Sequence, residues 1–110
     1  MLLFLAANEI AAETNHFAKE LKPLLKRYCY ECHSGDDAES GVAFDRFTDS
    51  AEVQTEIELW EKVVRLVKER QMPPADAFEL ETQPLQKLVS GIEYELSQLD
   101  CSSESRPGRV

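Results

Sequence analysis

Two cysteines and a histidine stand together in this chain, at Cys29, Cys32 and His33, and they spell the pattern C-x-x-C-H. In this order and spacing the three side chains are the attachment signal for a c-type haem. One helical turn brings both thiols to the haem edge that carries the vinyl groups, where thioether bonds form. The histidine that follows lies under the iron as its proximal ligand. The pattern therefore predicts one covalently bound haem c, attached at Cys29 and Cys32, with His33 on the iron.

Three other interpretations of these cysteines remain open. A thiol-redox C-x-x-C needs a strand-to-helix setting, and the surrounding sequence does not provide one. A structural zinc site needs four ligands, so Cys29, Cys32 and His33 would have to be joined by His16 or Cys101. A chance match without a cofactor is the third. The total of three cysteines is odd, which does not suit a disulfide framework.

Met72 is the best candidate for the distal iron ligand. Apart from Met1 it is the only methionine, and the two prolines that follow it stiffen its loop. A thioether is a known axial ligand of haem iron. The alternative is that Met72 only fills a gap in the core. His16 is the rival ligand and would give a bis-histidine haem, but it lies over three helical turns before Cys29.

Apolar residues recur at helical spacing in three stretches, which predict helices over residues 14–28, 51–70 and 84–99. Pro23 interrupts the first stretch, so it either kinks one helix or lies in the first turn of a shorter one. Gly91 in the third stretch is a poor helix former and indicates a close approach between helices. No pattern supports a sheet. The predicted fold is all-α, a small cytochrome c-like fold with about three main helices around one haem.

The length and charge of the chain limit its partners. With 110 residues it fits one domain with a modest core. It carries 12 basic and 21 acidic residues, a formal net charge of −9, which argues against binding nucleic acid. Solubility alone explains an acidic surface. The functional alternative is a redox partner protein with a basic docking face.

Both ends of the chain are predicted to lie outside the folded domain, which spans residues 14–100. Residues 1–13 are either a signal-peptide remnant or a disordered start: an apolar run is present, but no positively charged segment precedes it. Residues 101–110 have no apolar period and are predicted to be disordered. No apolar run is long enough to span a membrane. Because haem c is attached on the outer side of the bacterial inner membrane, we expect a periplasmic or otherwise exported protein.

Four segments of the chain resemble the planctomycete-type cytochrome c module in their order and spacing. They are HFAKELKPLLKRYCYECHS, SGVAFDRF, LWEKVVRLVKERQMPPAD and LQKLVSGIEYEL. The resemblance covers about residues 17–99. It implies a reduced class I cytochrome c fold with crossing terminal helices. It also implies haem attachment at Cys29 and Cys32, with His33 as the proximal and Met72 as the distal ligand.

Electron transfer by a six-coordinate haem is the function that these features favour, and such a protein is not an enzyme. Haem-based catalysis or sensing is the alternative; it needs a labile distal site, and a methionine ligand argues against it. Trp60 and Phe44 are candidates for packing against the haem, with a plain core role as the alternative. Arg46, Arg65 and Arg70 are candidates for bonding haem propionates, with solvated surface as the alternative.

Overall fold

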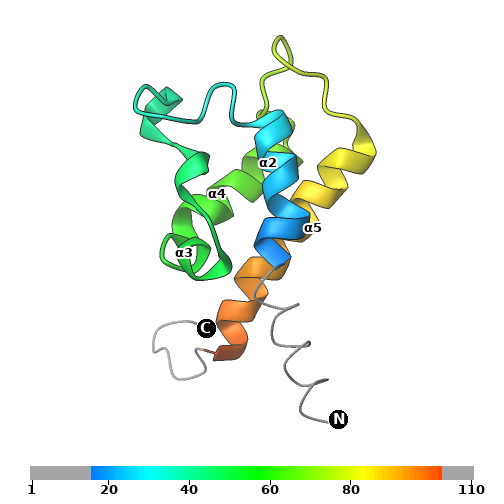
Figure 1. The fold of residues 1–110 in the computed structure, drawn as a ribbon. Helices are drawn as coiled ribbons and strands as arrows, with labels where there is room; N and C mark the ends of the chain where they lie inside the picture. The colour runs from blue at the N-terminus through cyan, green and yellow to red at the C-terminus, as the bar shows by residue number, and fades with distance from the viewer. Residues whose placement is uncertain (1–15, 103–110) are drawn as a thin grey trace.

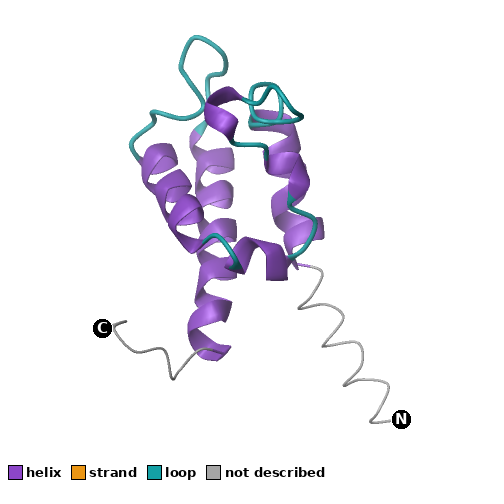
Figure 2. Cartoon of the chain, turned by 90° about the vertical axis from the view of Figure 1, so that its left-hand side faces the viewer, coloured by secondary structure: helices purple, strands orange, loops and turns teal. Residues whose placement is uncertain are grey.

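Helices make up the regular structure of the chain in this computed structural model, which describes residues 16–102, with side chains through residue 98. The elements are η1 (Phe17–Leu21), α2 (Lys22–Tyr28), η2 (Glu39–Gly41), η3 (Phe44–Arg46), α3 (Ser50–Gln54), α4 (Ile57–Lys68) and α5 (Thr82–Ser102). Among them η1 is π-helical, while η2 and η3 are single 3₁₀ turns. The described residues contain no strand (Figure 2), so the all-α prediction is confirmed.

The first predicted helix divides around Pro23. This proline lies in the first turn of α2, but η1 directly precedes α2 and helical backbone angles continue through Leu21 and Lys22. Just before it, the backbone N–H of Lys22 donates to the carbonyl of Phe17, which is the wide π-type turn. Pro23 therefore lies in the first turn of α2, as one of the two predicted arrangements had it, but η1 continues the helical path on the N-terminal side.

The second predicted helix, over residues 51–70, is wrong as a single element. The chain forms α3, breaks at Thr55 and Glu56, and starts again as α4. The Thr55 hydroxyl donates to the carbonyl of Glu52 at 2.7 Å, and the Thr55 N–H bonds the same carbonyl at 3.2 Å. Threonine hydroxyls compete in this way with the helical ladder, and a purely apolar periodicity does not register the competition.

The long C-terminal helix α5 packs against both the η1–α2 segment and α4. Figure 1 shows α2 and α5 passing each other at an angle, with α4 alongside. Gly91 lies where the terminal helices meet: a Cβ atom built there would stand 3.4 Å from Cδ1 of Leu21. The close approach predicted from Gly91 is confirmed, and it lets the two terminal helices share one core.

That core is formed by buried apolar side chains from every main helix. They are Phe17, Leu21, Leu25, Phe44, Phe47, Val53, Trp60, Val64, Val67, Leu80, Leu88, Val89 and Ile92. The predicted start over residues 1–13 and most of the predicted tail lie outside the described residues. The helix α5 continues to Ser102, slightly past the predicted domain end at residue 100.

Candidate functional site

The C-x-x-C-H segment forms a tight turn at the C-terminal end of α2. The backbone N–H of Cys29 donates to Leu25 at 2.8 Å and closes the helix. The N–H of His33 then donates to the carbonyl of Cys29 at 2.9 Å, which continues the helical sense for one more turn. The Ser34 hydroxyl adds a bond to the carbonyl of Tyr30 at 2.6 Å. Local hydrogen bonds thus hold both thiols and the imidazole on one turn.

The imidazole of His33 is oriented by the segment that follows η2. Its Nδ1 donates to the carbonyl oxygen of Val42 at 3.0 Å, because a carbonyl can only accept. The proton is therefore on Nδ1, and Nε2 keeps the lone pair that a metal requires. Phe44 packs edge-on against the ring with centroids 5.4 Å apart, and its N–H donates to the His33 carbonyl at 2.8 Å.

Met72 is positioned by the way in which α4 ends. Arg70 has φ +58°, and the N–H of Gln71 reaches back to the carbonyl of Leu66 at 2.8 Å, which is a Schellman arrangement. The guanidinium of Arg70 donates to the carbonyl of Leu80 at 2.7 Å and ties the loop back to the core. The N–H of Met72 also bonds the Leu66 carbonyl, at 3.2 Å. The helix therefore ends before the prolines, and its own C-terminal bonds fix the start of the Met72 loop.

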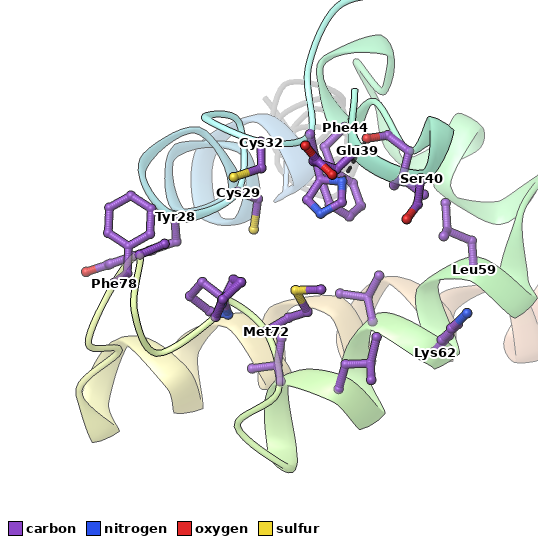
Figure 3. Close-up of a pocket in the computed structure, with 18 residues that line it drawn as sticks. Tyr28, Cys29, Cys32, Glu39, Ser40, Phe44, Leu59, Lys62, Met72 and Phe78 are labelled. Carbon is purple, nitrogen blue, oxygen red and sulfur yellow. Dashed lines mark hydrogen bonds between the residues drawn. The ribbon is translucent and has the colours of Figure 1, made fainter. Parts of the chain in front are cut away.

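The C-x-x-C-H turn after α2 and the Met72 loop after α4 form two walls that face each other across one cavity of about 350 Å³. Figure 3 shows Cys29 and Cys32 on the α2 side and Met72 on the α4 side, with the sulfur atoms of Cys29 and Met72 toward the space between. His33 also lines this cavity. Apolar side chains supply most of the remaining lining: Val42, Phe44, Leu59, Val63, Leu66, Val67, Pro73, Pro74, Ala77 and Phe78.

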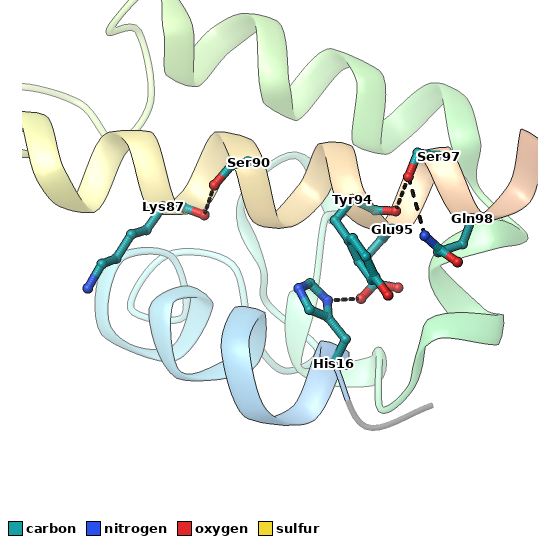
Figure 4. Close-up of polar contacts among 7 residues, drawn as sticks. All are labelled: His16, Lys87, Ser90, Tyr94, Glu95, Ser97 and Gln98. Carbon is teal, nitrogen blue, oxygen red and sulfur yellow. Dashed lines mark hydrogen bonds and ion pairs between the residues drawn. The ribbon is translucent and has the colours of Figure 1, made fainter. Parts of the chain in front are cut away.

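Two residues considered for the site from the sequence lie elsewhere. Trp60 is fully buried in the core, with its ring 5.2 Å from Phe44 and 5.0 Å from Phe47, and it is not part of the cavity lining. His16 lies beside α5, where its Nδ1 is 2.5 Å from Oε2 of the fully buried Glu95 (Figure 4). Phe44 therefore lines the cavity, and Trp60 packs against Phe44 in the core. His16 pairs with Glu95 outside the cavity lining.

Part of the lining was missed from the sequence. On α4, Leu59 and Leu66 face the cavity, whereas Trp60 faces the core. The signal was present, because α4 is apolar over a wider arc than one packing partner needs. The hydrogen bond from His33 to the carbonyl of Val42 could not be predicted from the sequence, since every residue carries a backbone acceptor.

The electrostatics of the cysteines bear on the other interpretations of the motif. Burial, with a smaller contribution from the charge of Cys32, raises the pKa of the Cys29 thiol to about 12. Such a thiol stays protonated at neutral pH, which makes it a poor redox nucleophile. Within residues 16–98 no group of three or more His, Cys, Asp or Glu side chains is placed to hold a metal ion. The ligand set that a structural zinc site needs is thus not assembled in this part of the chain.

The residues present do fit a haem. An imidazole with a free Nε2 and a thioether reach into the same cavity, two thiols stand beside them, and the lining is apolar. The volume lies within the roughly 300–1,000 Å³ typical of cofactor and ligand sites. A helical fold with this donor set defines a c-type cytochrome domain, of the haem-binding, electron-transferring kind.

Comparison with known protein families agrees with this class. Residues 29–76 match the family model of planctomycete cytochrome C, a stretch that runs from Cys29 past Met72. Over that stretch, which is less than half of the 110 residues, the chain is similar to planctomycete-type cytochrome c, and this supports the module that the resemblance of its four segments predicted. Neither the curated proteins nor the solved structures gave a significant match.

Proposed function

We propose that this domain transfers single electrons through one haem c that is covalently attached at Cys29 and Cys32, with His33 and Met72 as axial ligands. The observation that carries the proposal is the convergence of these four side chains on one apolar cavity. When bound, haem c supplies a one-electron iron couple. The protein's role is to hold the ligands, exclude water from the haem faces and leave one edge within reach of a partner.

The axial residues set the chemistry of the site. The carbonyl of Val42 accepts from Nδ1 of His33, which leaves Nε2 of the neutral ring to bind iron. Met72 is a soft thioether, and a histidine–methionine pair gives a higher reduction potential than two histidines do. Because both axial positions are filled, no site is left for a substrate, and the domain acts as a carrier rather than an enzyme.

The location and the partner are further parts of the proposal. Export is supported by the attachment chemistry of haem c and by the apolar run at residues 2–7. The net charge of −9 favours a redox partner with a basic docking face. In the described part of the chain, no helix combines the length and the apolar character that crossing a bilayer requires.

A second function has one observation in its favour. The Met72 side chain is 36% exposed, more than any other large apolar side chain among the described residues. An exposed ligand can dissociate, and an open distal position would permit haem-based catalysis or sensing. The two functions differ in whether the resting protein binds an exogenous ligand such as carbon monoxide.

The visible absorption spectrum tests the proposed function. The chain is produced behind a full export leader, purified and measured in both oxidation states. Sharp α and β bands on reduction indicate low-spin haem, and haem that stays with the polypeptide after denaturation and solvent extraction is covalently bound. A weak band near the red end of the oxidised spectrum indicates methionine on iron. A colourless protein that binds zinc or cycles a disulfide would refute the proposal.

A further inference from the structure

The two ends of the cavity differ in chemical character. Figure 3 shows Tyr28 and Phe78 at the end near the thiols, while Ser40 and Lys62 lie at the other end, with Met72 between them. The first end is aromatic, and its two rings pack edge to face with centroids 6.1 Å apart. The second end carries a hydroxyl and an amine. A ligand that fills the whole cavity must therefore have an apolar end and a polar end.

Haem has this polarity, and the thiols give it a direction. Its two vinyl groups stand on one edge of the macrocycle and its two propionates on the opposite edge. Thioether bonds at Cys29 and Cys32 would fix the vinyl edge beside the aromatic end of the cavity. The propionate edge is then directed toward Ser40 and Lys62. This step rests on the proposed function, because it requires covalent attachment at both cysteines.

Lys62 is the one lysine or arginine among the residues that line the cavity. It makes no ion pair within the described part of the chain, whereas Arg46 is paired with Glu56 and Lys68 with Glu93. None of the arginines considered from the sequence lines the cavity, and Arg70 is committed to a backbone carbonyl. The cavity therefore offers a single cation to an anionic group.

A carboxylate near the polar end of the cavity gives the amine of Lys62 an electrostatic role. Glu39 lines the same region of the cavity, so a carboxylate already stands there. Two more carboxylates placed beside Glu39 would repel it and each other unless a cation offsets them. Lys62 extends from α4, on the wall opposite to η2, where it can reach an acidic group between the two.

We propose that Lys62 is the positioning residue for a haem propionate. The amine keeps that propionate ionised and offsets its negative charge. A propionate charge near the iron stabilises the oxidised form, so the amine stabilises the reduced form and raises the reduction potential. Lys62 is exposed, so solvent screening limits the effect. For an exposed pair of this kind, we expect removal of the cation to change the equilibrium constant for haem reduction by about two- to fivefold.

The test compares two lysines of the same helix. Lys62→Gln and Lys68→Gln change the net charge equally, but Lys68 lies outside the cavity lining and pairs with Glu93 at 3.1 Å. In the haem-loaded full chain, the potential is measured against pH by spectroelectrochemistry. We expect Lys62→Gln to lower the equilibrium constant for reduction by about two- to fivefold. It should also raise the pKa of the propionate, so that the potential becomes more dependent on pH. Lys62→Arg should restore both properties.

The outcomes separate this inference from the proposed function. If no haem is attached, or if the wild type lacks methionine on iron, the proposed function fails and the inference fails with it. If haem and methionine ligation are present but Lys62→Gln has the same potential and pH profile as Lys68→Gln, the assignment of Lys62 alone is overturned. A thermal melt of each variant verifies that the fold is kept.

Discussion

Removing the haem should leave this domain without a stable tertiary structure. The perturbation is the double variant Cys29→Ala with Cys32→Ala, purified free of haem. The cavity of about 350 Å³ would then be empty or hydrated. At about 24 cal/mol per Å³ of cavity, this void costs as much as about 8 kcal/mol. The figure is an upper bound, because the cavity is open to solvent and can partly collapse. Even so, it is comparable to the roughly 5–15 kcal/mol that stabilises a typical domain.

The assay follows tertiary and secondary structure separately. We expect the haem-free double variant to keep much of its far-UV circular dichroism but to lose its near-UV signal and its cooperative melt, as a molten globule does. Added haemin should restore part of the cooperativity, because a ligand that binds only the folded state stabilises it. Cys101→Ala is the matched control, since Cys101 lies outside the motif, and it should retain haem and melt cooperatively. A sharp melt of the haem-free double variant with a native near-UV spectrum would refute this reasoning.

Three further predictions concern the two terminal helices, the start of α3 and export. His16→Ala leaves the buried carboxylate of Glu95 without its partner and should destabilise the haem-loaded domain by about 3 kcal/mol in a denaturant titration. Adding Glu95→Leu to that variant should recover most of the loss, and a variant that loses nothing contradicts the pairing. The pKa of Glu52 is lowered mainly by the side-chain hydrogen bond from Thr48, so the stability it contributes is present above the ordinary glutamate pKa and is lost as the pH falls through the lowered folded value. Thr48→Val should raise the pKa of Glu52 in a carboxyl NMR titration while Thr48→Ser should not, and equal values in both would count against the assignment. Haem content should depend on a full export leader, and equal haem content with and without a leader rules out export as a requirement.

Local features of the site could be predicted from the sequence. The C-x-x-C-H turn lies within five residues, so its geometry depends on hydrogen bonds between near neighbours such as His33 and Cys29. Met72 could be singled out because methionine is rare in this chain. The placement of Met72 opposite the C-x-x-C-H turn depends on how α4 ends, and in particular on the left-handed conformation of Arg70. A non-glycine residue there gives no warning in the sequence, because glycine is the usual choice.

The features that the sequence did not predict depend on tertiary contacts. Trp60 and Val63 belong to one broad apolar arc of α4, and only the packing decides which of them faces the core and which faces the cavity. The break at Thr55 is local by contrast, because its hydroxyl donates to the carbonyl of Glu52 three residues earlier, a bond that apolar periodicity does not register. Lys62 looks like a solvated lysine in the sequence, and it becomes notable only because it is the cation at the polar end of the cavity.

Carbon monoxide binding to the reduced protein is the most direct test of the central claim, that His33 and Met72 are the axial ligands. Two variants, Met72→Ala and Met72→Leu, both remove the thioether, and Met72→Leu keeps the bulk of the side chain. We predict that the wild type scarcely binds carbon monoxide, because both axial positions are filled. Both variants should retain covalent haem, bind carbon monoxide readily and have a lower reduction potential. If the wild type binds carbon monoxide as readily as the variants do, Met72 is not the distal ligand and the axial assignment is wrong.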